Sequence, residues 1–149
     1  MRSGVRLALD IGARRIGVAR CDRDGILAVP ESTLDAGDPA WMDAVAALVD
    51  AYAPIELVIG KPVTLRGTDE LAVANVRAQA EALQARIPAL TIRLVDERLS
   101  TASSMRALRE AGRSTRTARA VIDAAAAVAI LEFALETERR TGEPAGTTL

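Results

Sequence analysis

The chain has 149 residues, a formal net charge of −1 at pH 7, and a sequence in which 50% of the residues are hydrophobic. A chain of this size and composition folds as one globular domain without a disulfide or a structural metal. It contains no histidine and a single cysteine, Cys21. This excludes Ser-His-Asp and Cys-His catalysis, an intrachain disulfide, and zinc sites built from histidines or four cysteines. A lone thiol without a histidine is a poor nucleophile, so we interpret Cys21 as a packing residue.

The first 30 residues predict three short strands joined by tight turns. The first strand covers residues 7–9 and ends at Asp10 and a glycine turn. The second covers residues 16–19 and the third covers residues 26–30. An Asp-Gly pair between the second and third strands favours hairpin geometry, so we expect an antiparallel meander.

The rest of the chain alternates between helical and strand patterns. The predicted elements are, in order, a helix at 41–52, a strand at 55–59, a helix at 69–86, a strand at 90–95, a short helix from Ser100 or Thr101 to Gly112, and a long helix at 115–138. This order predicts an α/β domain over residues 1–140. Its mixed five-stranded sheet has three antiparallel strands followed by two parallel strands, with helices on both faces. Residues 141–149 are rich in Gly, Pro and Thr, and we expect a disordered tail there.

Neither a secretion signal nor a membrane span is evident in the sequence. The N-terminus becomes charged again at Asp10, and therefore lacks the continuous apolar core of a signal peptide. The most apolar stretch, residues 120–135, carries Asp123 and Glu132 and is too short to cross a bilayer. We therefore expect a cytoplasmic protein that does not associate with membranes.

Positive charge is concentrated in two segments. Residues 1–23 have a net charge of +4 and residues 98–119 a net charge of +5, whereas residues 24–97 have a net charge of −7. If the fold joins the two basic segments, they form one face suited to nucleic-acid phosphates. If it does not, they are two separate solvated surfaces, and charge alone does not decide between these interpretations.

Two acidic residues follow predicted strands. Asp10 and Glu97 both stand where a strand ends, which is where α/β sheets bind ligands. Asp96 and Glu97 are neighbours, so strand alternation directs them to opposite sides, and one of them can share the edge of Asp10. A solvated turn or strand end explains each of these acids equally well when it is taken alone.

Asp123 is the sharpest single signal in the sequence. It is the only charged residue between Arg119 and Glu132, in a helix that is apolar on nearly every side. An ionised carboxylate in such a helix is costly unless it is paired with a cation, faces a solvent gap or binds a metal. Three converging carboxylates without a histidine suit Mg²⁺ or Mn²⁺, which prefer oxygen ligands. Two such ions can activate a water and stabilise the leaving oxygen of a phosphodiester.

Four blocks of the sequence resemble those of the YqgF-type family, in the same order and with matching spacing. The blocks are residues 7–12 with 15–19, residues 58–62 with 67–68, residues 95–101, and residues 122–127 with 130–131. The family is one of Holliday junction resolvase-like nucleases, also described as pre-16S rRNA processing nucleases. The resemblance covers about residues 5–136. It implies a ribonuclease H-like fold and a metal-dependent site at Asp10, Glu97 and Asp123, with Mg²⁺ or Mn²⁺ as the cofactor.

The resemblance also implies that a set of basic and polar residues flanks the substrate around this site: Arg15, Arg98, Thr101, Arg116 and Arg119. Arg14 and Lys61 are two further candidates for contacts with nucleic acid. Lys61 stands where the family usually has an apolar residue, and it either contacts a phosphate or lies at a loop surface. The segment before Asp123 is commonly lysine rich in the family. Here it carries arginines, which keep the positive charge.

The implied function is hydrolysis of phosphodiester bonds in structured nucleic acid, at the 5′ end of pre-16S rRNA during ribosome biogenesis. One alternative is a resolvase-like endonuclease that acts on branched DNA, which would need two sites in a symmetric dimer. Another is a nucleic-acid-binding factor for ribosome assembly or transcription that does not turn over. The turn after Asp10 also resembles the first phosphate block of sugar kinases and actin-like ATPases, but those proteins use two large domains. The sequence leaves open whether the protein is a monomer or a homodimer.

Overall fold

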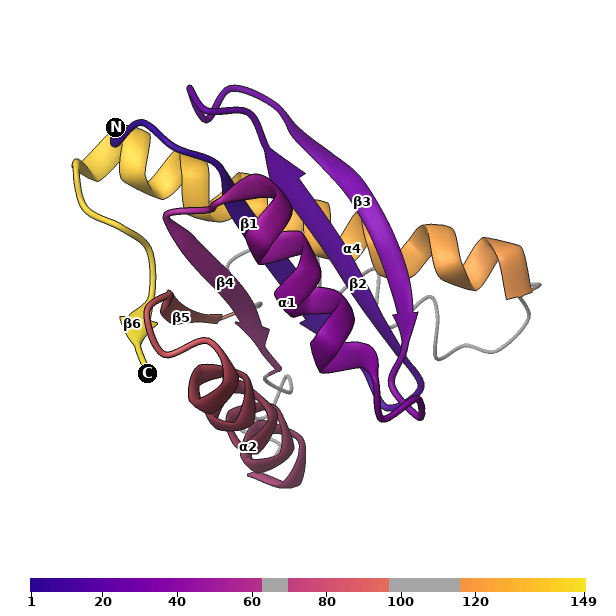
Figure 1. Ribbon diagram of the computed structural model, residues 1–149. Helices are drawn as coiled ribbons and strands as arrows, with labels where there is room; N and C mark the ends of the chain where they lie inside the picture. Colours follow the sequence, from indigo (N-terminus) through magenta and orange to yellow (C-terminus); the bar gives the residue numbers. More distant parts are fainter. Residues whose placement is uncertain (63–69, 97–115) are drawn as a thin grey trace.

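A six-stranded mixed sheet forms the centre of the molecule, with helices on both faces (Figure 1). The computed structural model describes residues 1–62, 70–96 and 116–149, with the backbone alone at 70 and 116–123. The strands are β1 (Arg6–Ile11), β2 (Arg15–Cys21), β3 (Ala28–Asp35), β4 (Glu56–Lys61), β5 (Thr91–Asp96) and β6 (Thr147–Thr148). The helices are α1 (Trp41–Tyr52), α2 (Glu70–Arg86) and α4 (Arg116–Thr141).

The strand order is β3-β2-β1-β4-β5-β6. The pairs β1–β2 and β2–β3 are antiparallel, and β4 runs parallel to both β1 and β5. The predicted meander followed by two parallel strands is therefore confirmed. The short helix expected between residue 100 or 101 and residue 112 lies outside the described residues.

The sixth strand lies in the segment that we expected to be disordered. Thr147 and Thr148 pair antiparallel with Leu94 and Arg93 of β5, and the N–H of Leu149 donates to the carbonyl oxygen of Ile92 at 3.0 Å. This pairing satisfies part of a strand edge that otherwise presents unpaired backbone groups. The expectation of disorder fails because two residues are too few to produce a strand pattern, so composition alone guided it.

The third strand begins later than the sequence suggests. Ile26 and Leu27, which we expected inside it, are 76% and 62% exposed and belong to the turn. Their backbone N–H groups donate to the carboxylate of Asp22 at 2.9 and 2.7 Å. These hydrogen bonds lower the pKa of Asp22 and hold the two residues in the turn rather than in the ladder.

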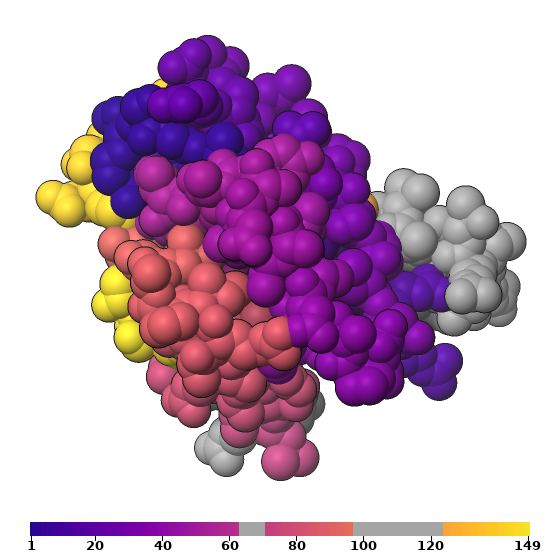
Figure 2. Space-filling model, viewed as in Figure 1, coloured from indigo at the N-terminus to yellow at the C-terminus, as the bar shows by residue number. Residues whose placement is uncertain are grey.

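Side chains of the sheet alternate between two cores. On β1, Leu7, Leu9 and Ile11 pack in the core that α1 and α2 cover. Ala8 packs in the second core, against α4, and alternation places Asp10 on that same face. Helices α1 and α2 cover the first face in the space-filling view (Figure 2). Among the described residues, no helix is long and apolar enough to span a membrane.

Helix α4 packs closely on the sheet because alanines form its buried stripe. Its sheet-facing positions include Ala126, Ala127, Ile130, Leu131, Ala134 and Leu135. Small side chains let the helix backbone approach the strands. The helix runs antiparallel to β1, because Glu138 near its end contacts Arg6 at the beginning of β1. Its first turns therefore lie toward the edge of the sheet where β1 ends (Figure 1).

Candidate functional site

Strand β1 carries Asp10 into the interior of the protein. The side chain is 0% exposed, and its register partner on β2 is Gly17. On the other side, Leu9 is the partner of Ile59, so Gly60 of β4 lies beside Asp10. A carboxylate buried in the middle of a sheet costs free energy, and proteins keep such groups where a cation or hydrogen-bond donors compensate them. Asp10 is therefore the position around which a site is most strongly indicated.

The parallel strands β1, β4 and β5 end at a common edge, but their last side chains do not share a face. Lys61 and Asp96 are register partners at the ends of β4 and β5. Ile59 and Leu94, two residues earlier on each strand, pack in the core under α1 and α2. Lys61 and Asp96 therefore lie on the face opposite to that of Asp10. Glu97, the next residue after Asp96, lies outside the described residues.

Helix α4 passes over the face that holds Asp10. Position 123 is seven residues before Ile130, which is two helical turns, and it lies on the same stripe as Ala126 and Ala127. The structure describes the backbone of Asp123 within α4 but not its side chain. The placement of this stripe over the sheet agrees with the predicted partnership of Asp123 with Asp10 but does not test it.

The turn between β1 and β2 presents two arginines at the same edge. Arg14 is exposed and Arg15 is half-buried, and the N–H of Gly12 donates to the carbonyl oxygen of Arg15 at 2.9 Å to close the turn. Arg15 has the same strand parity as Gly17 and Ala19, so it lies on the α4 face together with Asp10.

The other predicted contacts are placed in part. Lys61 is the last residue of β4 rather than a loop residue. Arg116 and Arg119 belong to the first turns of α4, with side chains that are not described. Arg98 and Thr101 lie outside the described residues. Thus Arg14 and Arg15 are the predicted contacts that the structure brings to the edge of Asp10.

The donor chemistry at Asp10 fits a hard divalent cation. No group of three or more acidic or cysteine side chains that could hold a metal occurs among the described residues. Glu97 and the side chain of Asp123, the other two predicted ligands, are not among those residues. The chain has no histidine, so a metal set built on Asp10 is made of oxygen donors, which suit Mg²⁺ or Mn²⁺ rather than zinc.

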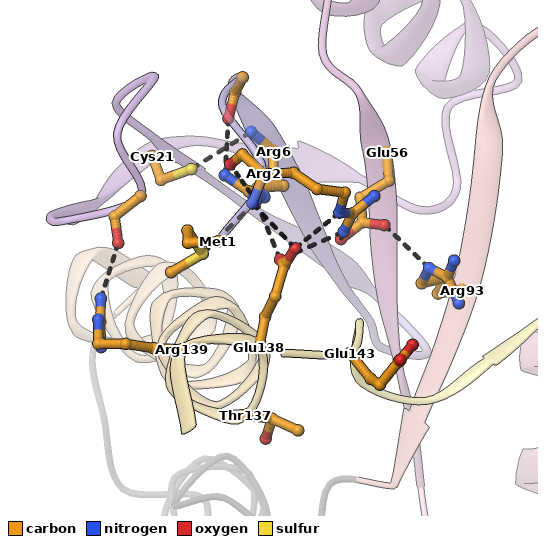
Figure 3. A network of polar contacts seen from close by, with 12 residues as sticks. Met1, Arg2, Arg6, Cys21, Glu56, Arg93, Thr137, Glu138, Arg139 and Glu143 are labelled. Atoms are coloured by element: carbon orange, nitrogen blue, oxygen red, sulfur yellow. Dashed lines mark hydrogen bonds and ion pairs between the residues drawn. The ribbon is translucent and has the colours of Figure 1, made fainter. Parts of the chain in front are cut away.

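A network of buried ion pairs lies at the opposite end of the sheet (Figure 3). Glu138 of α4 is 3% exposed and accepts hydrogen bonds from Arg2 Nε at 2.6 Å and from an Arg6 guanidinium nitrogen at 2.9 Å. Burial by itself raises the pKa of Glu138, but the hydrogen bonds from Arg2 and the charge of Arg6 lower it to about 2. The carboxylate is therefore charged at neutral pH.

The same network extends across the strands through Glu56. This buried carboxylate pairs with Arg2 at 3.0 Å and with Arg93 Nε at 2.9 Å. The network thus ties the N-terminal segment, β1, β4, β5 and the end of α4 together. Its carboxylates are occupied by arginines, so we interpret it as structural. The sequence analysis did not predict this network. A signal for it is present, because Arg6 and Glu56 carry opposite charges at the first positions of two apolar strands and are register partners.

Cys21 is a packing residue, as predicted. It is 1% exposed in the core beneath α4, and its Sγ accepts a hydrogen bond from the N–H of Arg6 at 3.2 Å. Burial raises the pKa of the thiol, which keeps it protonated and unreactive at neutral pH.

The architecture is similar to that of two solved structures. It is similar to RuvC of Thermus thermophilus in complex with a Holliday junction substrate, with a TM-score of 0.61 and 12% identity over 98% of this chain and 99% of that chain. A second Thermus thermophilus RuvC structure gives a TM-score of 0.57 over 97% and 99% of the two chains. At this identity the likeness shows the fold alone, which is ribonuclease H-like, as the sequence predicted.

The sequence itself defines the family. Residues 4–137 match the RuvX family model, described as Holliday junction resolvase, and the chain belongs to this family of nucleases. It is 48% identical over 147 residues to a protein of Streptomyces coelicolor, covering 98% of this chain and 88% of that protein. It is also 48% identical to a Thermobifida fusca protein, covering 98% and 96%, and 49% identical to one from Cutibacterium acnes, covering 91% and 84%. All three are named "Putative pre-16S rRNA nuclease".

Proposed function

We propose that the protein is a divalent-metal-dependent nuclease that processes the precursor of 16S rRNA in the cytoplasm. One observation carries the proposal: Asp10 is 0% exposed at the parallel edge of a ribonuclease H-like sheet, in a chain of the RuvX family. A carboxylate at this edge of the sheet is an oxygen ligand of the kind that Mg²⁺ or Mn²⁺ prefers, and these ions serve phosphodiester hydrolysis.

We assign Glu97 and Asp123 as the other two acids of the site. Asp96 lies on the face opposite to Asp10, which argues against it as a ligand at the same site, so Glu97 is the better choice of the two. Asp123 is chosen because its position lies on the sheet-facing stripe of α4. Together these three acids supply the oxygen donors that Mg²⁺ or Mn²⁺ prefers.

The metal, when bound there, supplies an activated water and stabilises the leaving oxygen. The residues of the chain do the rest. The carboxylate of Asp10, on the central strand β1, would hold the ion. Arg14 and Arg15, at the β1–β2 turn on the same edge, contact the phosphate backbone. Because the metal supplies the activated water, this mechanism needs no histidine as a general base, and the chain contains none.

Four further residues complete the proposed contact surface: Arg98, Thr101, Arg116 and Arg119. They come from the segment that carries a net charge of +5 and from the beginning of α4. Lys61 lies on the opposite face of the sheet, and we therefore give it no role at the reacting phosphate. Because the contacts are mostly arginines and the aromatic content is 2%, recognition rests on the phosphate backbone and on the shape of the substrate.

Structured RNA is preferred over branched DNA on the strength of the relatives. Those named for pre-16S rRNA are 48% identical over nearly the whole chain, whereas the RuvC structure bound to a Holliday junction is 12% identical. Branched DNA remains the second candidate because the family model is described as Holliday junction resolvase. One copy of the chain suffices for RNA cleavage, whereas resolution of a junction requires a symmetric pair of sites.

A cleavage panel tests the proposed function. The protein is incubated with a labelled pre-16S rRNA fragment, a single-stranded RNA and a four-way DNA junction, each with Mg²⁺, Mn²⁺ or EDTA. We expect cleavage of the rRNA precursor with metal and none with EDTA. Cleavage of the junction alone identifies the DNA alternative. Binding of the precursor without cleavage under any metal identifies a non-enzymatic binding factor and contradicts the proposal.

A further inference from the structure

Gly60 lies where Ile130 of α4 packs tightly against β4. A Cβ atom placed on Gly60 would be 2.5 Å from Ile130 Cδ1 and 3.2 Å from Ile130 Cγ1. Contacts below 3.0 Å are essentially never seen for real Cβ atoms, so a side chain at this position forces a shift. Ile130 is 0% exposed and has no solvent-facing space into which to move.

The glycine is required for space and not for backbone conformation. The glycines with a positive φ in the described residues are Gly4, Gly25, Gly142 and Gly146. Gly60 is absent from that set, lies inside β4 and pairs with Val95 of β5. Any residue can adopt its backbone conformation, and only the approach of α4 excludes a side chain.

The contact lies beside the buried acid. Gly60 follows Ile59, the register partner of Leu9, so it is the neighbour of Asp10 across the β1–β4 ladder. Position 123 lies two helical turns from Ile130 along α4. This contact therefore contributes, together with the alanines of the same stripe, to how close this part of α4 lies to the strand that carries Asp10.

We propose that Gly60 is a positioning residue that sets the separation between Asp10 and Asp123 by seating α4 directly on β4. The inference rests on the proposed function, because it assigns a purpose to that separation. A methyl group at position 60 requires a displacement of roughly 1 Å at its contact with the Ile130 side chain, the difference between the 2.5 Å contact and an ordinary one of at least 3.4 Å. Because Ile130 is fully buried, part of this displacement passes to α4. A misplacement of about 1 Å at a catalytic site can cost on the order of 100-fold in rate.

The test is Gly60→Ala with Ile130→Val as its second-site rescue. Ile130→Val removes Cδ1, the atom that the new methyl group meets at 2.5 Å. Gly37→Ala is the matched control, because its Cβ meets only a carboxylate oxygen of Asp35 at 3.2 Å in an exposed loop. Each variant is measured for kcat and KM on the rRNA precursor, for Mn²⁺ affinity by titration calorimetry, and for folding by circular dichroism.

We expect Gly60→Ala to lower kcat by roughly 10- to 100-fold and to weaken Mn²⁺ binding, with little change in KM. The double variant with Ile130→Val recovers both quantities, and Gly37→Ala matches the parent. A Gly60→Ala protein with parental kcat and Mn²⁺ affinity overturns the proposal, and so does a loss that Ile130→Val fails to rescue.

Two further outcomes are separable from these. If Gly60→Ala alone does not fold, the double variant still tests the proposal. We expect the double variant to fold and to cleave like the single variant Ile130→Val. A double variant that folds but does not cleave contradicts the proposal. If the parent cleaves no substrate, the proposed function fails. The Mn²⁺ affinities of Gly60→Ala and the double variant then test the positioning role by themselves.

Discussion

Arg6 and Glu138, which lie 132 positions apart in the chain, form a buried ion pair of 2.9 Å between the first residue of β1 and the last turns of α4. Both side chains are almost completely excluded from solvent, at 1% and 3% exposure. The pair anchors one end of α4 to the strand whose other end carries Asp10. The orientation of the helix over the candidate site therefore depends on a contact at the far edge of the sheet.

Removing the charge of Glu138 destabilises the fold. Glu138→Gln leaves Arg6 buried without a carboxylate, and breaking a buried pair in this way costs about 3–5 kcal/mol. The control is Glu136→Gln, since Glu136 pairs with Arg139 on the surface, where an ion pair contributes less than about 1 kcal/mol. Urea denaturation of the two variants measures both values. Equal losses of unfolding free energy in the two variants would contradict the claim that the buried Arg6–Glu138 pair stabilises the fold more than the surface pair does.

The same carboxylate predicts how stability depends on pH. The pKa of Glu138 is lowered from 4.5 to about 2, so its contribution is fully present above pH 4.5 and is lost as the pH falls toward 2. The free energy of unfolding of the parent should therefore fall over this window more steeply than that of Glu138→Gln. Urea denaturation at steps between pH 5 and pH 2 gives the two curves. Parallel curves would contradict the assigned pKa.

The C-terminal strand depends on Gly146. Its φ is +75°, and a Cβ there would lie 2.1 Å from the carbonyl oxygen of Leu94. Gly146→Ala should displace β6, uncover the edge of β5 and release Leu149 from the core, with a loss of roughly 1–3 kcal/mol. Gly142→Ala is the control, because its φ is +77° but nothing lies within 4 Å of its Cβ. Equal losses of unfolding free energy in the two variants would mean that strain, and not docking of the tail, is responsible.

Substrate binding should separate the two faces of the sheet edge. Arg15→Ala on the α4 face is expected to weaken binding of the rRNA precursor and to reduce the slope of log K against log salt by about 1. Lys61→Ala, on the opposite face, is expected to leave that slope unchanged. Fluorescence anisotropy across a salt series measures both. A change caused by Lys61→Ala and not by Arg15→Ala would reverse the assignment of the substrate face.

Much of the fold is predictable because its signals are local. The apolar run before Asp10, the helical spacing beginning at Trp41 and the alanine-rich stretch around Ile130 each produce an element in the expected place. These patterns arise because a strand or helix is buried on one face or on two faces. The buried positions are apolar, so the sequence itself shows strand alternation or helical periodicity. Asp10 could be selected for the same reason, since an acid that ends an apolar strand is conspicuous.

The features that escaped prediction depend on partners far away in the chain. Strand β6 forms because β5, some 50 positions earlier, offers an edge with which it can pair. The close contact at Gly60 involves Ile130 of α4, which lies 70 positions later in the chain. A local pattern contains no information about such contacts, so they appear only when the strands and helices are placed in space.

The most direct test of the central claim compares two aspartates at the same sheet edge on opposite faces. Asp10→Asn and Asp96→Asn each replace one carboxylate oxygen by an amide nitrogen with almost no change in shape. Metal-dependent cleavage of the pre-16S rRNA fragment and Mn²⁺ affinity are measured for both variants and the parent. We predict that Asp10→Asn loses cleavage and Mn²⁺ binding while Asp96→Asn keeps both. Undiminished cleavage by Asp10→Asn would contradict the assignment of the site.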